Sequence, residues 1–248
     1  MPVSKKRKKK NRSSGGRGGS NRPGYRPGVL EDDTAPGVER LLTFPAHALP
    51  SIGLAEFYLM ASPARNANQC GAATVALVEA AHALGLGAEG IALTLDVNDR
   101  HGGLKRYGSL EPKVQAGQII GHVGALIDGM LIDATGTQFP EVRRLAGASR
   151  PISVHIGHER VEQARVAGGM VGVRMHGEVL QYTLLPGVGE PLLEQVHSLN
   201  SDLIRWTHEF LVPNFCRSLA MDGFFEEVLT LTDQRYEQFV SMVEVARD

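Results

Sequence analysis

The amino-acid sequence predicts an α+β fold, and three observations lead to this prediction. Residues 71–84 are rich in Ala and Leu and contain no Pro, which is typical of a helix. Residues 119–135 show two strand-like runs joined by Asp128-Gly129, a strong signal for the turn of an antiparallel hairpin. Beyond Pro191, apolar residues recur close to helical spacing, which predicts a helical C-terminal part.

The first predicted helix begins at a cysteine. The helix stops at Gly85 and Gly87, a common exit, and Cys70 falls in or next to its first turn. The positive end of the helix dipole favours a thiolate at this position, and the small side chains of residues 71–73 leave the sulfur reachable. The alternative is a buried structural cysteine, which is the commoner role of a lone Cys in an Ala-rich helix.

The predicted hairpin places a histidine and a carboxylate on one face. With a two-residue turn Ile127 faces Met130, and this register makes His122 and Asp133 diagonal neighbours, about 7 Å apart at the backbone. Gly124 has no side chain and leaves a gap through which the two groups could meet. A carboxylate so placed would fix the tautomer of the imidazole and stabilise its charged form.

The two faces of the hairpin differ in composition. One face carries apolar side chains only and suits a core: Val123, Ala125, Ile127, Met130, Ile132 and Ala134. The other face carries the histidine and the carboxylate: His122, Gly124, Leu126, Leu131, Asp133 and Thr135. The alternative to a functional pair is a polar, half-solvated sheet face with a chance histidine. It is weakened because a one-residue slip would move both polar groups among the core residues.

These two segments carry a family resemblance. NQCGAATVALVEAA followed by GHVGALIDGMLIDATGTQF resembles the papain-like superfamily in its transglutaminase-like and arylamine N-acetyltransferase-like branches, over about residues 60–140. The resemblance implies a helix bearing the cysteine packed on an antiparallel sheet. It also implies a triad in which Cys70 is the nucleophile, His122 the base and later the acid, and Asp133 the group that orients the histidine.

The chain departs from this family pattern at two points. Gly124 stands where an aromatic residue often follows the histidine by two, which could change the substrate groove. No oxyanion-hole donor is marked, although Gln69 and Asn68 are candidates beside the backbone N–H of Cys70, whereas papain-type enzymes place their Gln further upstream.

The function expected from the resemblance is cysteine-dependent acyl transfer or hydrolysis of an amide, ester or thioester. The substrate would be a peptide or a small acyl compound, and the triad does not decide between water and an amine as acceptor. The alternative is a non-catalytic binding module of the same fold, whose basic tail docks on nucleic acid or another acidic partner. No metal site or cofactor is expected, because neither cysteine has a Cys-x-x-Cys partner and no phosphate-binding glycine loop follows a convincing strand.

The chain is expected to have three parts: a disordered basic tail over residues 1–30, a domain over 31–187, and a helical C-terminal extension over 188–248. The resemblance implies that the domain over 31–187 is papain-like and of catalytic type. Ten of the 26 Lys and Arg residues lie within residues 1–28, which contain no acid. This low-complexity segment allows weak, non-specific and salt-dependent binding of polyanions, and a solubilising tail is the simpler interpretation. It lacks the aromatic residues of a base-stacking module.

Composition also gives expectations about the environment of the protein. No apolar run approaches the length needed to cross a bilayer, so no membrane association is expected. The N-terminus lacks a secretory apolar region, and two cysteines make no disulfide framework, which together favour the cytoplasm.

The remaining segments have predicted structures as well. Strands are expected at 91–97, 151–156, 170–176 and 179–185, a short helix at 158–167, and one or two helices within 224–246. The polar stretch 98–118 is expected to be a long loop that covers the cleft, with His101, Lys105, Arg106 and Tyr107 as substrate contacts or solvated side chains.

Overall fold

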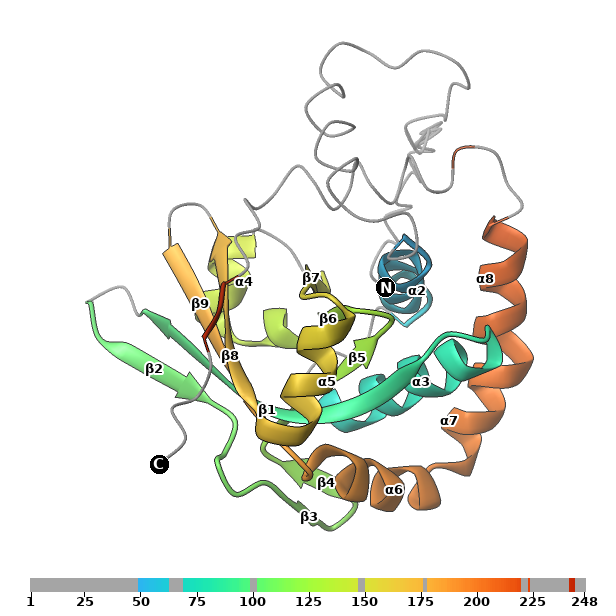
Figure 1. The fold of residues 1–248 in the computed structure, drawn as a ribbon. Coiled ribbons are helices and arrows are strands. Elements are labelled where there is room, and N and C mark those ends of the chain that lie inside the picture. The colour runs from blue at the N-terminus through green and yellow to red at the C-terminus, as the bar shows by residue number, and fades with distance from the viewer. Residues whose placement is uncertain are drawn as a thin grey trace, which may run out of the picture.

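Helices and antiparallel strands build the described part of the chain, which is residues 49–62, 69–98, 102–146, 150–175, 178–219, 223 and 241–243 of the computed structural model. The helices are α2 (Leu49–Ala61), α3 (Cys70–Ala83), η3 (Gly136–Gln138), α4 (Pro140–Ala146), α5 (His158–Ala167), α6 (Gly189–Leu199), α7 (Ser201–Trp206), η4 (Thr207–Leu211) and α8 (Val212–Leu219) (Figure 1). The predicted basic tail, residues 1–30, lies outside these ranges.

The strands are β1 (Ala88–Asn98), β2 (Leu104–Tyr107), β3 (Lys113–Gln115), β4 (Gln118–Ile120), β5 (His122–Ile127), β6 (Met130–Asp133), β7 (Ile152–His155), β8 (Gly169–Met175), β9 (Glu178–Leu185) and β10 (Ser241–Val243). Each strand pairing among the described residues is antiparallel. The predicted α+β class is therefore confirmed at the level of helices combined with an antiparallel sheet.

The main sheet is interrupted beside its longest strand. The strand order is β10-β8-β9-β1-β5-β6-β7, with β2 also paired to β1, while β3 and β4 form a hairpin of their own. On one side of β1, β5 pairs as far as Leu93, opposite His122, and β2 takes over at Leu95. The chain between β2 and β5 leaves the sheet at this point. The sheet therefore has a break directly beside His122.

One face of the sheet encloses a core of its own. Strands β1 and β5 to β9 all contribute buried side chains to a single apolar cluster, including β8 near one end of the sheet and β7 at the other. The sheet therefore curves around this cluster. Val142 and Leu145 of α4 and Ala164 of α5 complete it.

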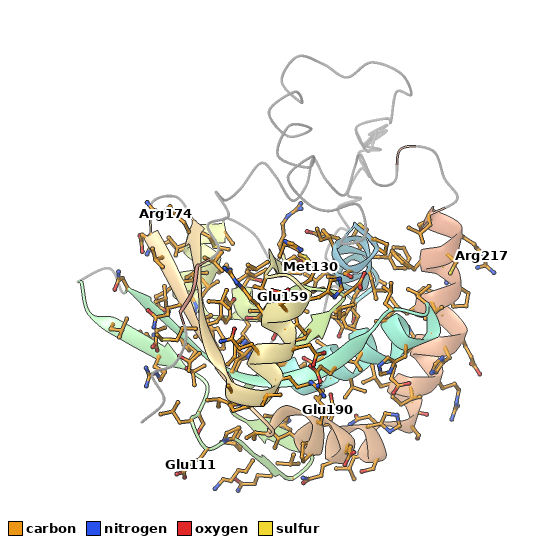
Figure 2. All side chains as sticks on the ribbon, viewed as in Figure 1. Glu111, Met130, Glu159, Arg174, Glu190 and Arg217 are labelled. Carbon is orange, nitrogen blue, oxygen red and sulfur yellow. The ribbon has the colours of Figure 1, made fainter. Side chains whose placement is uncertain are left out.

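The opposite face is covered by helices. Helices α2 and α3 pack their Ala-rich and Leu-rich faces on β5 and β6, and Leu211 and Phe215 from the C-terminal helices are buried in the same cluster. Met130 lies in this layer and is fully buried, whereas Glu111 and Arg217 are exposed at the periphery (Figure 2).

The segment predicted as a helical C-terminal extension packs directly on the α3 layer. Helix α6 contacts α3 and β1, and η4 contacts α3. The strands and the helix predicted for residues 91–97 and 151–185 are confirmed as β1, β7, α5, β8 and β9. One prediction is wrong, because residues 241–243, expected within a helix, pair as β10 with the edge of β8. Long-range pairing overrides local helical spacing here.

Within the described ranges, no helix combines the length and the apolar character needed to cross a bilayer.

The contact between α6 and β1 leads to a stability prediction. A Cβ added to Gly189 would lie 2.3 Å from the Gly90 carbonyl oxygen and 2.6 Å from the Ile91 Cα. Both neighbours are backbone and cannot rotate away. Gly189→Ala is therefore expected to lower the free energy of unfolding by about 2–3 kcal/mol, measured by urea titration. The control is Gly87→Ala, whose added Cβ meets nothing within 4 Å; equal stabilities of the two variants would contradict the prediction.

Candidate active site

The hairpin of β5 and β6 has the register that the sequence predicts. Ile127 pairs with Met130, and the pairs Leu126 with Leu131 and Ala125 with Ile132 follow. Asp128 and Gly129 form the turn with φ values of 48° and 84°, which are the positive values that a two-residue hairpin turn requires. The predicted pairing of this hairpin is thus confirmed.

The sheet face that carries His122 and Asp133 is not half-solvated. Both side chains are fully buried, and Leu126 and Leu131 on the same face belong to the enclosed core. The alternative of a polar, half-solvated face is therefore wrong. The physical reason is the curvature of the sheet, which buries the inner face as completely as the helices bury the outer face.

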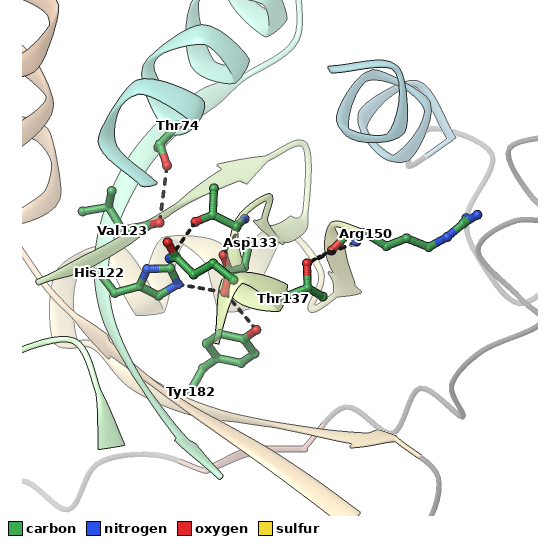
Figure 3. Close-up of polar contacts among 9 residues, drawn as sticks. Thr74, His122, Val123, Asp133, Thr137, Arg150 and Tyr182 are labelled. Atoms are coloured by element: carbon green, nitrogen blue, oxygen red, sulfur yellow. Dashed lines mark hydrogen bonds and ion pairs between the residues drawn. The ribbon is translucent and has the colours of Figure 1, made fainter. Parts of the chain in front are cut away.

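The imidazole and the carboxylate are hydrogen-bonded. His122 Nε2 lies 2.8 Å from Asp133 Oδ2 (Figure 3). Gly124 of β5 has no room for a side chain, because an added Cβ would lie 2.8 Å from the carbonyl oxygen of Ile132 in β6. An aromatic residue at position 124 is therefore excluded by the backbone of β6.

Two further donors hold the carboxylate. The Thr135 backbone N–H donates to Asp133 Oδ1 at 3.1 Å, and the Tyr182 hydroxyl donates to Oδ2 at 3.1 Å (Figure 3). Three hydrogen bonds from three segments thus satisfy a carboxylate that has no contact with water. Such satisfaction is what a buried charge needs.

The environment of His122 favours its charged form. Burial by itself would lower the pKa of the imidazole, but the negative charge of Asp133, the hydrogen bond to it and the interaction with the Cys70 thiol outweigh burial and raise the pKa to about 10. Within the described residues, no hydrogen bond of good geometry reaches Nδ1. Because Nε2 is occupied by Asp133, Nδ1 is the nitrogen available to the thiol.

Cys70 is the first residue of α3. The residue before it, Gln69, is the N-cap, and its side chain makes no capping hydrogen bond. The first N–H groups of the helix are therefore not capped by that side chain. Cys70 as a whole residue is 5 % exposed. Asn68, the other oxyanion candidate, lies outside the described residues.

The first turns of α3 are attached to the strand of the histidine. The Thr74 hydroxyl donates a long hydrogen bond of 3.4 Å to the Val123 carbonyl, next to His122 in β5 (Figure 3). Cys70 and Val123 also belong to one apolar cluster with Val75 and Ala92. The start of α3 is thereby held against β5, and the Cys70 thiol interacts with the His122 side chain.

An aromatic pair borders the imidazole. Phe139 packs edge-on against His122, with ring centroids 5.1 Å apart, and Tyr107 stacks on Phe139 at 4.0 Å. The Tyr107 hydroxyl bonds Glu141, which also binds Lys105 at 2.8 Å. These two hydrogen bonds lower the pKa of Glu141 to about 2, and the bond from Lys105 has the larger effect. Phe139 thus supplies an aromatic neighbour that position 124 cannot.

A cleft of about 900 Å³ opens beside the helix start. Its walls are the first turn of α3, the β3–β4 turn with the start of β4 (Ala116–Ile119), and helices α6 and α7, with Tyr58 of α2 beside them. Gln69 lines it, and so do Gly71 and Ala72, which flank Cys70. The thiol itself is not part of the lining, so it lies just behind the cleft wall.

The segment 98–118 differs from the loop expected from the sequence. It forms β2 and β3, because its residues pair with β1 and β4. Arg106 makes a two-pronged ion pair with Asp96, both bonds being 2.7 Å, and Lys105 binds Glu141. These two side chains hold structural partners, so their assignment as substrate contacts is not supported. His101 lies outside the described residues.

Sequence reasoning missed Tyr182 and Phe139. The signal for Tyr182 was present, because it alternates with Leu180 and Leu184 in a strand and a buried tyrosine hydroxyl needs a partner. Phe139 follows a 3-10 turn after the hairpin, and no local pattern relates it to His122.

Comparisons with known proteins add no relative. No family model matches the chain, and no curated protein or solved structure matches it significantly. Among the described residues, no group of three or more His, Cys, Asp or Glu side chains is arranged to hold a metal ion.

Proposed function

We propose that this protein is a cysteine-dependent hydrolase or acyltransferase with a papain-like fold of the transglutaminase-like or arylamine N-acetyltransferase-like type. Cys70 is the nucleophile, His122 the general base and acid, and Asp133 the orienting carboxylate. The observation that carries the proposal is the buried bond from His122 Nε2 to Asp133, which leaves Nδ1 available to a thiol at the start of a helix.

The arrangement supports an acyl-enzyme mechanism. The Cys70 thiolate attacks the carbonyl carbon of an ester, thioester or amide, and a C–S bond forms. The proton on His122 Nδ1 passes to the leaving oxygen, sulfur or nitrogen as its bond to the carbonyl carbon breaks. Water or an amine then gives a proton back to Nδ1 and attacks the thioester, and the C–S bond breaks to restore the thiolate.

The backbone N–H groups of the first turn of α3 are the best oxyanion donors. They have no acceptor within the helix, and the helix dipole favours negative charge there. Gln69 lines the neighbouring cleft, and its side chain makes no capping hydrogen bond to the helix. The side-chain amide can therefore serve as a second oxyanion donor. The cleft would receive the acyl or acceptor part of the substrate.

One observation favours the rival function, a binding module that keeps the fold without catalysis. Cys70 is only 5 % exposed and does not line the cleft. In that case the thiol would be a packed apolar side chain, and the His–Asp pair would only satisfy buried polar atoms.

The two cysteines of the chain allow a direct test. Cys70 is buried and Cys216 is exposed, so accessibility alone would make Cys216 react first. If the imidazole holds Cys70 as a thiolate, iodoacetamide at pH 5.5–6 should alkylate Cys70 at least roughly tenfold faster than Cys216. Peptide mass spectrometry over a time course measures both rates in one sample.

The control for this test is His122→Gln, which keeps a donor towards Asp133 but removes the base. It should slow the alkylation of Cys70 and leave Cys216 unchanged. Faster reaction at Cys216 in the wild-type protein, or equal reactivity of Cys70 with and without His122, would support the binding-module alternative.

A further inference from the structure

Tyr182 reaches across the inside of the sheet to the candidate triad. It lies in β9, which is separated from the strand of Asp133 by β1 and β5 in the strand order. Its side chain is fully buried, and its hydroxyl lies 3.1 Å from Asp133 Oδ2 (Figure 3). The curvature of the sheet makes this contact possible.

Core packing alone does not account for a tyrosine at this position. The neighbouring inward residues of β9, Leu180 and Leu184, are apolar, and phenylalanine would fill nearly the same space. A buried hydroxyl costs free energy unless it is hydrogen-bonded. The partner here is the same carboxylate oxygen that accepts the Nε2 proton of His122.

We propose that Tyr182 is a positioning residue for the triad: its hydroxyl fixes Asp133 Oδ2 and limits how strongly that oxygen holds the Nε2 proton of His122. This inference rests on the proposed function of His122 as the base. The Thr135 N–H holds the other oxygen, so two donors from different segments fix the carboxylate plane. The imidazole then has a single orientation in which Nδ1 is presented to Cys70.

The hydroxyl also withdraws charge from Oδ2. Without it, Oδ2 would accept from His122 alone and become a stronger acceptor, so the imidazole would hold its protons more tightly. The other titratable groups near the ring are Cys70 on the Nδ1 side and, behind Phe139, Tyr107 with the Glu141–Lys105 pair. The Tyr182→Phe substitution alters none of these side chains.

Proton NMR of the full chain tests the inference without a substrate. His122 and Asp133 are fully buried, so the Nε2 proton should exchange slowly and give a low-field resonance that is absent in His122→Gln. Tyr182→Phe should move this resonance downfield. Incorporation of 3-fluorotyrosine at position 182, which makes the hydroxyl a better donor and keeps the fold, should move it upfield. Leu184→Val, a packing change on the same strand and in the same core, should leave it in place.

Hydrolysis of p-nitrophenyl acetate gives the functional readout. Tyr182→Phe should lower kcat roughly tenfold with little change in KM, since the loss affects the chemical step. A resonance that stays in place in Tyr182→Phe, or that moves the same way with phenylalanine and fluorotyrosine, would overturn the role of Tyr182. Failure of the proposed function appears separately, as a Cys70→Ser variant that hydrolyses the ester as fast as the wild type.

Discussion

Replacing Asp133 by asparagine should reduce ester hydrolysis by a factor on the order of 10⁴, even though the side chain keeps its shape. The reason lies in the three partners of this carboxylate. The Thr135 N–H can only donate, so the single amide oxygen of asparagine must face it. The amide NH₂ then faces His122 and donates to Nε2, which moves the neutral imidazole proton to Nδ1. A protonated Nδ1 facing Cys70 cannot accept the thiol proton.

The measurement is kcat for p-nitrophenyl acetate, with Asp128→Asn as the matched control. Asp128 lies in the turn of the same hairpin with a φ of 48°, a conformation that asparagine tolerates well. The control should retain wild-type activity. A loss of less than tenfold in Asp133→Asn would mean that the tautomer of His122 does not limit the reaction.

The stability of the protein should depend on pH through His122. Its pKa is about 6.5 in the unfolded chain and about 10 in the folded protein. A raised pKa stabilises the fold fully below pH 6.5, and the contribution is lost as the pH rises towards 10. A shift of this size corresponds to roughly 3–5 kcal/mol of unfolding free energy. The wild-type protein should therefore lose stability over this pH window.

Urea unfolding at several pH values between 6 and 10 measures this effect as the difference between the wild type and His122→Gln. Subtraction removes the contribution of groups that titrate in both proteins. The difference should shrink as the pH rises. His197→Gln, at an exposed position, controls for removal of an imidazole as such. A difference that stays constant across the window would show that His122 is neutral in the fold.

The sequence predicted the local geometry of the site well, because that geometry is set by short-range rules. A two-residue turn fixes the register of the hairpin, and the register fixes which side chains are neighbours. The neighbouring positions of His122 and Asp133 follow from these rules alone. The helix follows in the same way: its Ala-rich and Leu-rich composition predicts it, the glycines after Leu84 mark its end, and Cys70 is its first residue.

The burial of His122 and Asp133 could not be predicted from these short-range rules. Whether the inner face of a hairpin meets water or a second core depends on the curvature of the whole sheet. The enclosed core is built by strands that are distant in the sequence, and one of them, β9, supplies Tyr182, 49 residues from Asp133. The aromatic neighbour of His122, Phe139, also lies outside the hairpin. The family pattern often has an aromatic residue at position 124, but the β6 backbone leaves no room for a side chain there.

The three walls of the cleft have a consequence for the order in which the protein matures during synthesis. Cysteine, histidine and aspartate lie within residues 70–133, whereas the α6–α7 wall comes from Val196 to Trp206. A growing chain exposes its segments from the N-terminus onwards. Under the proposed function, the three candidate catalytic residues can therefore come together while the cleft proposed to receive the substrate is still unfinished. A chain that stops before α6 would carry all three proposed catalytic residues, but it would lack the α6–α7 wall of the cleft.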